Sequence, residues 1–230
     1  MPTRFYFSSS SSTEISPAVA TTWEHTGDLV RRRCGVIKDN SASASAAFTD
    51  EGAHGLTSSD TVLLQYISDP IEAQTLDAQI VDIQFRGSET AAGNNISLTW
   101  LIKVVSNNGT SVTGTALAIR RDASEFATSL TNRSDSATTT AVTANAGDRI
   151  VFELGHGGST ALGGGHNGTI SLGSDSATDL AVDDTTTTAD NPWIEFANAI
   201  TFAQPPGLGP SRESQIDRSQ SSTMSTLLRY

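Results

Sequence analysis

Residues 95–106 read NISLTWLIKVVS, and their apolar side chains alternate along the chain. Every second side chain from Ile96 to Val104 is apolar, and in a β-strand such side chains share one face. The stretch follows the turn-like AAGN of residues 91–94 and ends at NNGT, residues 107–110. Because Asn-Gly turns are typical of β-hairpins, TGTALAIR (113–120) is predicted to return as the next strand.

Similar β-rich stretches, bounded by turn-forming residues, recur through residues 1–203. They are RFYF (4–7), TTWEH (21–25), TVLLQYIS (61–68), QTLDAQIVDIQFRG (74–87), DRIVFELG (148–155), GTISLG (168–173) and PWIEFANAITF (192–202). The alternation in residues 74–87 changes phase near Asp82, which predicts one strand with a bulge. In residues 192–202, the face that carries Ile194 and Phe196 is predicted to point into the core.

Two polar stretches, residues 38–60 and 122–147, show almost no strand pattern and are predicted to be long loops for binding or assembly. No helix is expected beyond a turn or two around Ser124–Leu130. Short strands with Gly, Asn and Ser turns favour an all-β fold, an antiparallel β-sandwich of jelly-roll type, as the domain of residues 1–203. The strand pattern stops at Gln204–Pro206, so residues 204–230 are predicted to form an extended C-terminal arm.

Charge and composition limit the classes of partner. The chain has a net charge of −11, and only 37% of its residues are hydrophobic. An acidic surface repels phosphate groups, so nucleic acid is not an expected partner. No apolar run is long enough to span a membrane, and the first residues lack the apolar core of a signal peptide, so no membrane partner is expected and synthesis in a cytoplasm is predicted. The lone Cys34 excludes an internal disulfide and is predicted to be buried.

The sequence shows no catalytic set, and the chain is predicted not to be an enzyme. His156 and His166 flank GGSTALGGG without further ligands at metal-binding spacing. Both are interpreted as solvated loop residues, and no metal or cofactor is expected. The Asp residues between Asp175 and Asp184 resemble a calcium loop, but turn-forming carboxylates are the preferred interpretation.

A dense cationic spot lies at Arg31, Arg32 and Arg33, after the acidic residues Glu24 and Asp28. Ion pairs along a strand edge are the simpler interpretation of this triplet. At an assembly interface, the same guanidinium groups would bind carboxylates of an acidic neighbour in a bidentate manner. The triplet is therefore a candidate partner-binding site.

Residues 204–230, QPPGLGPSRESQIDRSQSSTMSTLLRY, have the composition of a disordered tail, with many Ser, Pro and Gly. Fully extended, the segment would reach about 90 Å, far beyond a body with a radius of gyration of about 16 Å. Ordering it costs about 1–2 kcal/mol of backbone conformational entropy per residue, which is more than the burial of its few apolar side chains contributes. Backbone hydrogen bonds must supply the rest, so strand addition to another subunit is predicted. Its candidate partner-binding residues are Ile216, Met224, Leu227, Leu228, Arg229 and Tyr230.

The two ends of the predicted body resemble segments of tailed-phage virion proteins. RFYFSSSSSTEISPAVATTWEHTGDLVRRR leads from an aromatic strand through Ser-Pro to a Trp and an Arg cluster, and TADNPWIEFANAITF carries the pattern of a last sandwich strand. The resemblance covers roughly residues 4–33 and 189–202, and it involves no catalytic signature.

The resemblance implies a structural protein of a tailed bacteriophage, most similar to a capsid decoration or cement protein. Such a protein is expected to bind the major capsid protein and copies of itself, as a homotrimer on the capsid exterior, after assembly in the host cytoplasm. The alternatives are a phage tail or fibre component and a calcium-dependent carbohydrate-binding module.

Overall fold

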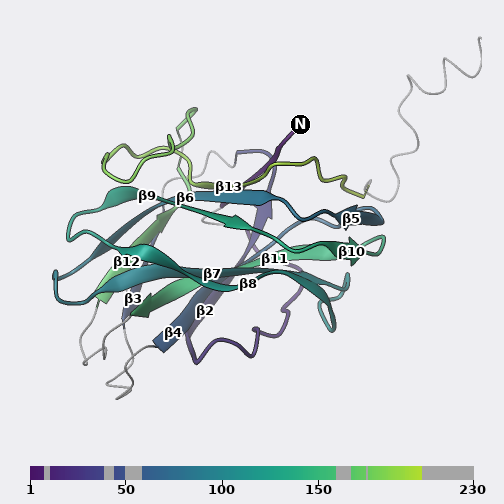
Figure 1. Ribbon diagram of the computed structural model, residues 1–230, viewed down its shortest axis with the longest axis horizontal. Helices are drawn as coiled ribbons and strands as arrows, with labels where there is room; N and C mark the ends of the chain where they lie inside the picture. The colour runs from purple at the N-terminus through teal and green to yellow at the C-terminus, as the bar shows by residue number, and fades with distance from the viewer. Residues whose placement is uncertain (8–10, 39–43, 50–58, 159–166, 175, 204–230) are drawn as a thin grey trace, which may run out of the picture.

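The structure is a computed structural model that describes residues 1–7, 11–38, 44–49, 59–158, 167–174 and 176–203. Across these residues the protein is all-β and contains no helix (Figure 1). The strands are β1 (Thr3–Phe7), β2 (His25–Gly35), β3 (Ala44–Thr49), β4 (Ser59–Ile67), β5 (Gln74–Leu76), β6 (Ile80–Glu89), β7 (Ile96–Val105), β8 (Val112–Glu125), β9 (Thr131–Thr138), β10 (Val142–Ala144), β11 (Arg149–Gly158), β12 (Asn167–Leu172) and β13 (Trp193–Phe196). The described residues therefore hold no helix that could cross a membrane.

One large sheet contains most of these strands, in the order β3-β12-β6-β13-β1-β2-β4-β11-β7-β8, and β9 pairs with β6. The described ladders are antiparallel except that of β2 and β4, which run parallel. The sheet is nearly closed. β8 and β9 lie close enough for Arg120 of β8 to bind both carboxylate oxygens of Asp135 on β9, at 2.7 Å each. β5 and β10 form a separate two-stranded sheet.

Two halves of the curled sheet face each other (Figure 1), and aromatic side chains pack in the core between them. The ring of Phe5 on β1 lies 5.2 Å from that of Phe152 on β11, and Phe152 lies 6.2 Å from Phe196 on β13. Edge-to-face contacts of this kind add to the free energy gained by burying apolar area. The alternation predicted for β7 places Trp100 in this core, fully buried.

Two predicted strands have different bounds in the structure. Residues 74–87 form β5 and β6 rather than one bulged strand, because β5 leaves the large sheet to pair with β10. Residues 192–202 form only the short β13, after which Phe202 makes an isolated bridge to Ile71. Ile194 and Phe196 are fully buried, as predicted.

Three other expectations are wrong. Residues 122–147 are not a strandless loop, because β8 runs to Glu125 and β9 and β10 follow. Residues 38–60 likewise contain β3, which pairs with β12. TTWEH is not a strand: residues 21–24 lie outside the strands, and the amide of Trp23 donates to the carbonyl of Ala20. The predicted arm, residues 204–230, lies outside the described residues.

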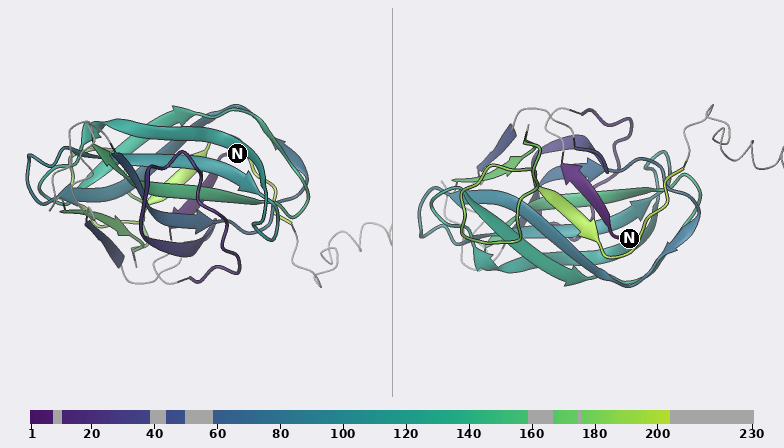
Figure 2. Two further views of the ribbon diagram at one scale, coloured as in Figure 1. Left: turned by 90° about the horizontal axis from the view of Figure 1, so that it is seen from below. Right: turned by 90° about the horizontal axis from the view of Figure 1, so that it is seen from above.

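Both faces of β7 are buried, although its pattern predicted only one apolar face. The second face is covered by residues 11–24, which we call the strap and which lies across β4, β7 and β11 (Figure 2). Strap residues Ile15, Val19 and Trp23 pack on the apolar side chains of this face. The strap also encloses polar groups such as the ammonium group of Lys103, which donates to the carbonyl of Ala18.

Candidate partner-binding groove

The Arg triplet lies near the end of β2, where the parallel ladder sets Arg33 beside Ile67 of β4. β4 ends at Ile67, so Asp69 follows close to the guanidinium group of Arg33. Nε and Nη2 of Arg33 donate to Oδ1 and Oδ2 of Asp69, at 2.7 Å each. These hydrogen bonds raise the pKa of Arg33, which therefore stays cationic. The predicted ion pair is confirmed for Arg33, although β2 lies between β1 and β4 rather than at an edge of the sheet.

Glu24, which precedes the triplet, is not the partner of Arg33. Its carboxylate accepts a hydrogen bond from the amide of Asp60 at 2.9 Å. The partner is instead Asp69, which follows β4. The parallel ladder places the end of β2 beside the end of that strand. The side chain of Asp28 lies outside the described side chains.

The three Arg side chains do not form one cationic patch. Arg31 donates to Oε1 of Gln65 at 2.9 Å and to the carbonyl of Pro17 at 3.5 Å, so it binds the strap. Arg32, whose side chain points to the opposite face of β2, donates to the carbonyl of Arg31 at 3.4 Å. Arg33 lines two cavities.

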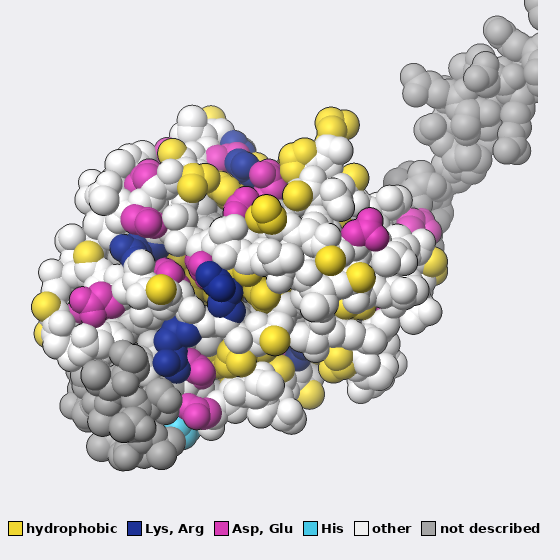
Figure 3. Space-filling model, in the orientation of Figure 1, with side chains coloured by type: hydrophobic (Ala, Val, Ile, Leu, Met, Phe, Trp, Pro, Cys, Tyr) yellow, Lys and Arg dark blue, Asp and Glu magenta, His cyan; other side chains and the backbone are white. Residues whose placement is uncertain are grey.

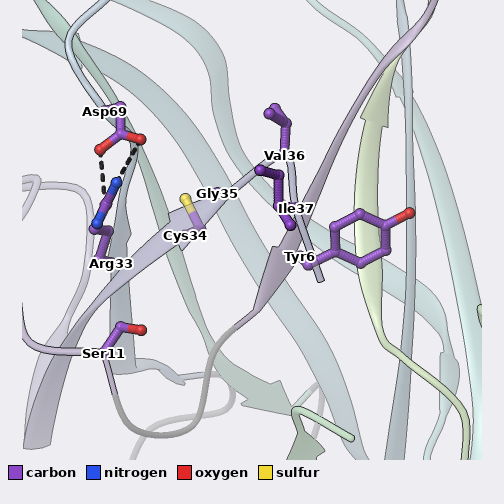
Figure 4. A pocket seen from close by; sticks show the side chains of 8 residues that line it. All are labelled: Tyr6, Ser11, Arg33, Cys34, Gly35, Val36, Ile37 and Asp69. Atoms are coloured by element: carbon purple, nitrogen blue, oxygen red, sulfur yellow. Dashed lines mark hydrogen bonds and ion pairs between the residues drawn. The ribbon is translucent and has the colours of Figure 1, made fainter. Parts of the chain in front are cut away.

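Two neighbouring cavities share Arg33, Val36 and Asp69. The smaller one, of about 220 Å³, is lined by Tyr6, Ser11, Arg33, Cys34, Gly35, Val36, Ile37 and Asp69 (Figure 4). The larger one, of about 940 Å³, is lined by Ser12, Thr13, Glu14, Arg33, Val36, Ile67, Asp69, Pro70, Asn107, Gly147, Arg149, Phe202 and Ala203. We call the two together the Arg33 groove.

A second guanidinium group lines the larger cavity. Arg149 is 8% exposed and donates to the carbonyl of Ser68 at 3.1 Å and to Oδ1 of Asn107 at 3.3 Å. Its Nη2 also pairs with the carboxylate of Glu14 at 3.1 Å, and the Glu14 side chain is 82% exposed. Each Arg of the groove is thus paired with a carboxylate that water or a partner can reach.

Apolar side chains surround these ion pairs. Val36 and Ile37, just beyond β2, are 44% and 82% exposed. At the other end of the groove, Phe202 and Ala203 are partly buried and are the last described residues of the chain. Exposed apolar side chains beside a cleft are typical of protein interaction sites. The groove can therefore hold a segment that has both apolar and charged side chains.

Cys34 lies in the wall of the smaller cavity, yet its side chain is fully buried, as predicted. Burial raises the pKa of its thiol far above the usual value. A thiol in this state is a poor nucleophile, so Cys34 contributes packing rather than reactivity.

The prediction for His156 is wrong, and the turn-forming interpretation of the acidic loop holds for Asp183 but not for Asp179, whose carboxylate pairs with Arg4 and Lys38. His156 lies in β11, opposite Leu98, and is fully buried, because the Gly-rich sequence around it continues the strand. Asp183 accepts hydrogen bonds from the amides of Thr185 and Thr186, at 3.1 and 2.9 Å, as a turn-forming residue does. In the described part of the chain, no three His, Cys, Asp or Glu residues could share a metal ion.

The polar cluster under the strap was not predicted. Glu153 is fully buried and accepts hydrogen bonds from Trp23, Gln65 and Lys103. A signal for it exists in the sequence, because Lys103 and Glu153 are opposite charges within otherwise apolar strands. The β7–β11 register places them as diagonal neighbours, with Lys103 opposite Val151.

The six candidate arm residues, Ile216, Met224, Leu227, Leu228, Arg229 and Tyr230, lie outside the described residues. Among the described candidates, the structure places Arg33 in a groove that a partner could occupy.

No protein-family model matches the sequence, and no curated protein matches it. Among solved structures, the chain is similar to a CocE/NonD family hydrolase from Staphylococcus aureus, with a TM-score of 0.49 and 11% identity over 87% of this chain and 36% of the hydrolase. An alpha-amino acid ester hydrolase gives a TM-score of 0.41 and 8% identity over 76% of this chain and 38% of the hydrolase. Eiger TNF from S. frugiperda gives a TM-score of 0.28 and 10% identity over 74% of this chain and 98% of the Eiger chain.

The chain spans little more than a third of the length of the two hydrolases. At TM-scores below 0.5 and identities of at most 11%, these similarities assign neither a fold family nor an activity.

Proposed function

We propose that the protein is a structural protein of a tailed-phage virion, a decoration or cement protein that binds the capsid exterior. Its body is a jelly-roll sandwich, and its partners are the major capsid protein and other copies of itself in a homotrimer. The observation that carries this proposal is the Arg33 groove, which lies where the described body ends at Ala203. The sequence that follows Ala203 has the composition of an assembly arm.

The groove fits a protein partner by its chemistry. Interfaces between proteins combine an apolar centre with a polar rim, and Arg is enriched in them. Val36, Ile37 and Phe202 supply the apolar part, and the pairs Arg33–Asp69 and Arg149–Glu14 supply the charged part. A carboxylate of the partner can replace that of Asp69 or Glu14, so that the guanidinium group of Arg33 or Arg149 stays paired.

The fold and surface charge are consistent with this role. The antiparallel strands of the two halves of the sheet meet across an aromatic core, which favours a jelly roll over an open sheet. On the face shown in Figure 3, Lys and Arg side chains lie next to Asp and Glu side chains. Mixed charge of this kind, on a chain with a net charge of −11, favours protein partners over DNA.

The proposal is tested by adding the purified full chain to capsids of the phage that encodes it, prepared without this protein, and measuring co-sedimentation. The expected result is saturable binding to shells, and light scattering should report a trimer of the free protein. Binding to isolated tails instead would assign the protein to the tail or fibre. Glycan binding that a calcium chelator abolishes, without binding to shells, would contradict the proposal in favour of a carbohydrate-binding module.

A matched pair of variants localises the binding. Asp69→Arg places two cations together in the groove and is expected to weaken shell binding at least tenfold. Folding should change little, because the Arg33–Asp69 pair is exposed and such pairs contribute about 0–1 kcal/mol. Asp77→Arg makes the same charge change on an exposed residue outside the groove and should leave binding unaltered.

A further inference from the structure

We propose that the Arg33 groove receives residues 204–230 of a neighbouring copy of the chain, so that the copies of the proposed trimer exchange arms. This inference rests on the proposed function and names the partner of the groove. Its basis is the position of the groove, the side chains that line it and the sequence of the segment that follows Ala203.

The root of the segment is fixed at the groove. The amide of Ala203 donates to the carbonyl of Pro70 at 2.9 Å, and Phe202 bridges to Ile71. Phe202 and Ala203 also line the larger cavity, together with Pro70. The groove and the start of the segment therefore lie on the same face of each copy.

This shared position favours exchange between copies. When three copies meet through this face around a three-fold axis, the root of each segment lies next to the groove of the next copy. The closed ring then makes three equivalent contacts between segment and groove. A segment that bound its own groove would make one such contact and leave the exposed side chain of Ile37 without a partner subunit.

The segment and the groove are complementary in chemistry. The far end of the segment, Leu227 to Tyr230, carries apolar side chains on both sides of Arg229. The groove offers apolar Val36 and Ile37 beside two exposed carboxylates, those of Asp69 and Glu14. The segment carries three Arg against Glu213 and Asp217, whereas the rest of the chain is strongly acidic.

Disulfide trapping between two differently tagged chains tests the exchange. One chain carries Ile37→Cys, at an 82% exposed position on the rim of the groove, and the other carries Leu228→Cys. The native Cys34 is retained, since its side chain is fully buried. After mixing and mild oxidation, the expected product is a disulfide-linked heterodimer on a non-reducing gel.

The control chain carries Val182→Cys, at a 69% exposed position that lines a different cavity. The heterodimer with Ile37→Cys should form at least ten times faster than that with Val182→Cys. Equal rates for the two positions would overturn the inference. So would a chain with both Ile37→Cys and Leu228→Cys that closes only on itself, at a rate independent of protein concentration.

The two proposals fail in different ways. Chains that bind capsid shells but give no preferential heterodimer would refute arm exchange and leave the proposed function standing. Chains that form the heterodimer but do not bind shells or tails would keep the exchange and refute the virion role.

Discussion

The indole nitrogen of Trp23 donates a hydrogen bond of 2.7 Å to Oε2 of Glu153, a residue 130 positions later in the chain. This contact fastens the strap to β11. The other carboxylate oxygen, Oε1, accepts from Gln65 at 2.9 Å and from the ammonium group of Lys103. Lys103 also donates to the carbonyl of Ala18, so the strap and the sheet share one buried polar network.

Removing the charge of Glu153 should destabilise the fold strongly. Glu153→Gln leaves the buried ammonium group of Lys103 without its counter-ion, and breaking a buried pair in this way costs about 3–5 kcal/mol. The free energy of unfolding, measured by urea denaturation, should fall by that amount. A loss below about 1 kcal/mol, the range of exposed pairs, would show that water reaches this network.

A double variant provides the control for this prediction. Lys103→Met with Glu153→Gln removes both charges and should recover most of the lost stability, because a neutral pair of similar volume avoids the cost of an unpaired buried charge. Recovery in the same urea experiment would assign the loss to charge. Equal instability of both variants would assign it to packing.

Trp23→Phe should loosen the strap while leaving the sheet intact. The substitution keeps an aromatic ring against Val62 but removes the donor to Glu153, and a hydrogen bond to a charged group contributes about 1.5–3 kcal/mol. Hydrogen exchange should accelerate at the amide of Ala20, which donates to the same carboxylate. Amides of β7 should exchange as in the native protein.

Gly155→Ala should be among the most damaging small substitutions. The β11–β4 register shifts between Leu154 and Gly155, and a Cβ at Gly155 would collide with the backbone carbonyl of Thr61. Backbone cannot move aside as a flexible side chain can, so a lower thermal midpoint is expected. Gly93→Ala serves as the control, because its Cβ would meet no atom within 4 Å, and its midpoint should match the native value.

Asp135 should contribute to stability at neutral pH and lose that contribution in acid. Burial alone would raise its pKa, but hydrogen bonds from Arg120 and Trp100 outweigh this effect and lower it. Its stabilisation is therefore present above the unfolded pKa of about 3.9 and is lost as the pH falls through the lower folded value. Asp135→Asn should flatten this part of the stability–pH curve, and an unchanged slope would contradict the assignment.

Tyr6 should titrate late in alkali. Burial, followed by its hydrogen bond to Asp179, raises the pKa of its phenol to about 12. Because the folded pKa is raised, this contribution to stability is present below the unfolded value of about 10 and disappears as the pH rises through 12. Phenolate absorbance of the native protein, with Tyr6→Phe as reference, measures the titration. A pKa near 10 for Tyr6 would contradict the partly buried hydrogen bond to Asp179.

The strands that the sequence predicted best are those whose pattern alternates without interruption. β4, β7 and β11 lie where TVLLQYIS, NISLTWLIKVVS and DRIVFELG placed them. β9, with the sequence TNRSDSAT, was missed because it has few apolar side chains. It forms a strand nonetheless because β6 pairs with it along its whole length.

For the candidate groove, the sequence marked Arg33 but not its partner or its cavity. Asp69 is 36 residues away, and the parallel pairing of β2 with β4 brings it to Arg33. No local pattern distinguishes a parallel from an antiparallel neighbour at this position. Phe202 and Arg149 reach the same groove from still more distant parts of the chain.

The sequence by itself determined the all-β class, the core face of β7 and the burial of Cys34, because these follow from side chains a few residues apart. Only the tertiary structure decided that His156 lies in the core, that the strap covers a second face of β7, and that Arg33 meets Asp69. The physical reason is that burial and ion pairing depend on which distant strands become neighbours. That choice is made by the packing of the whole sheet.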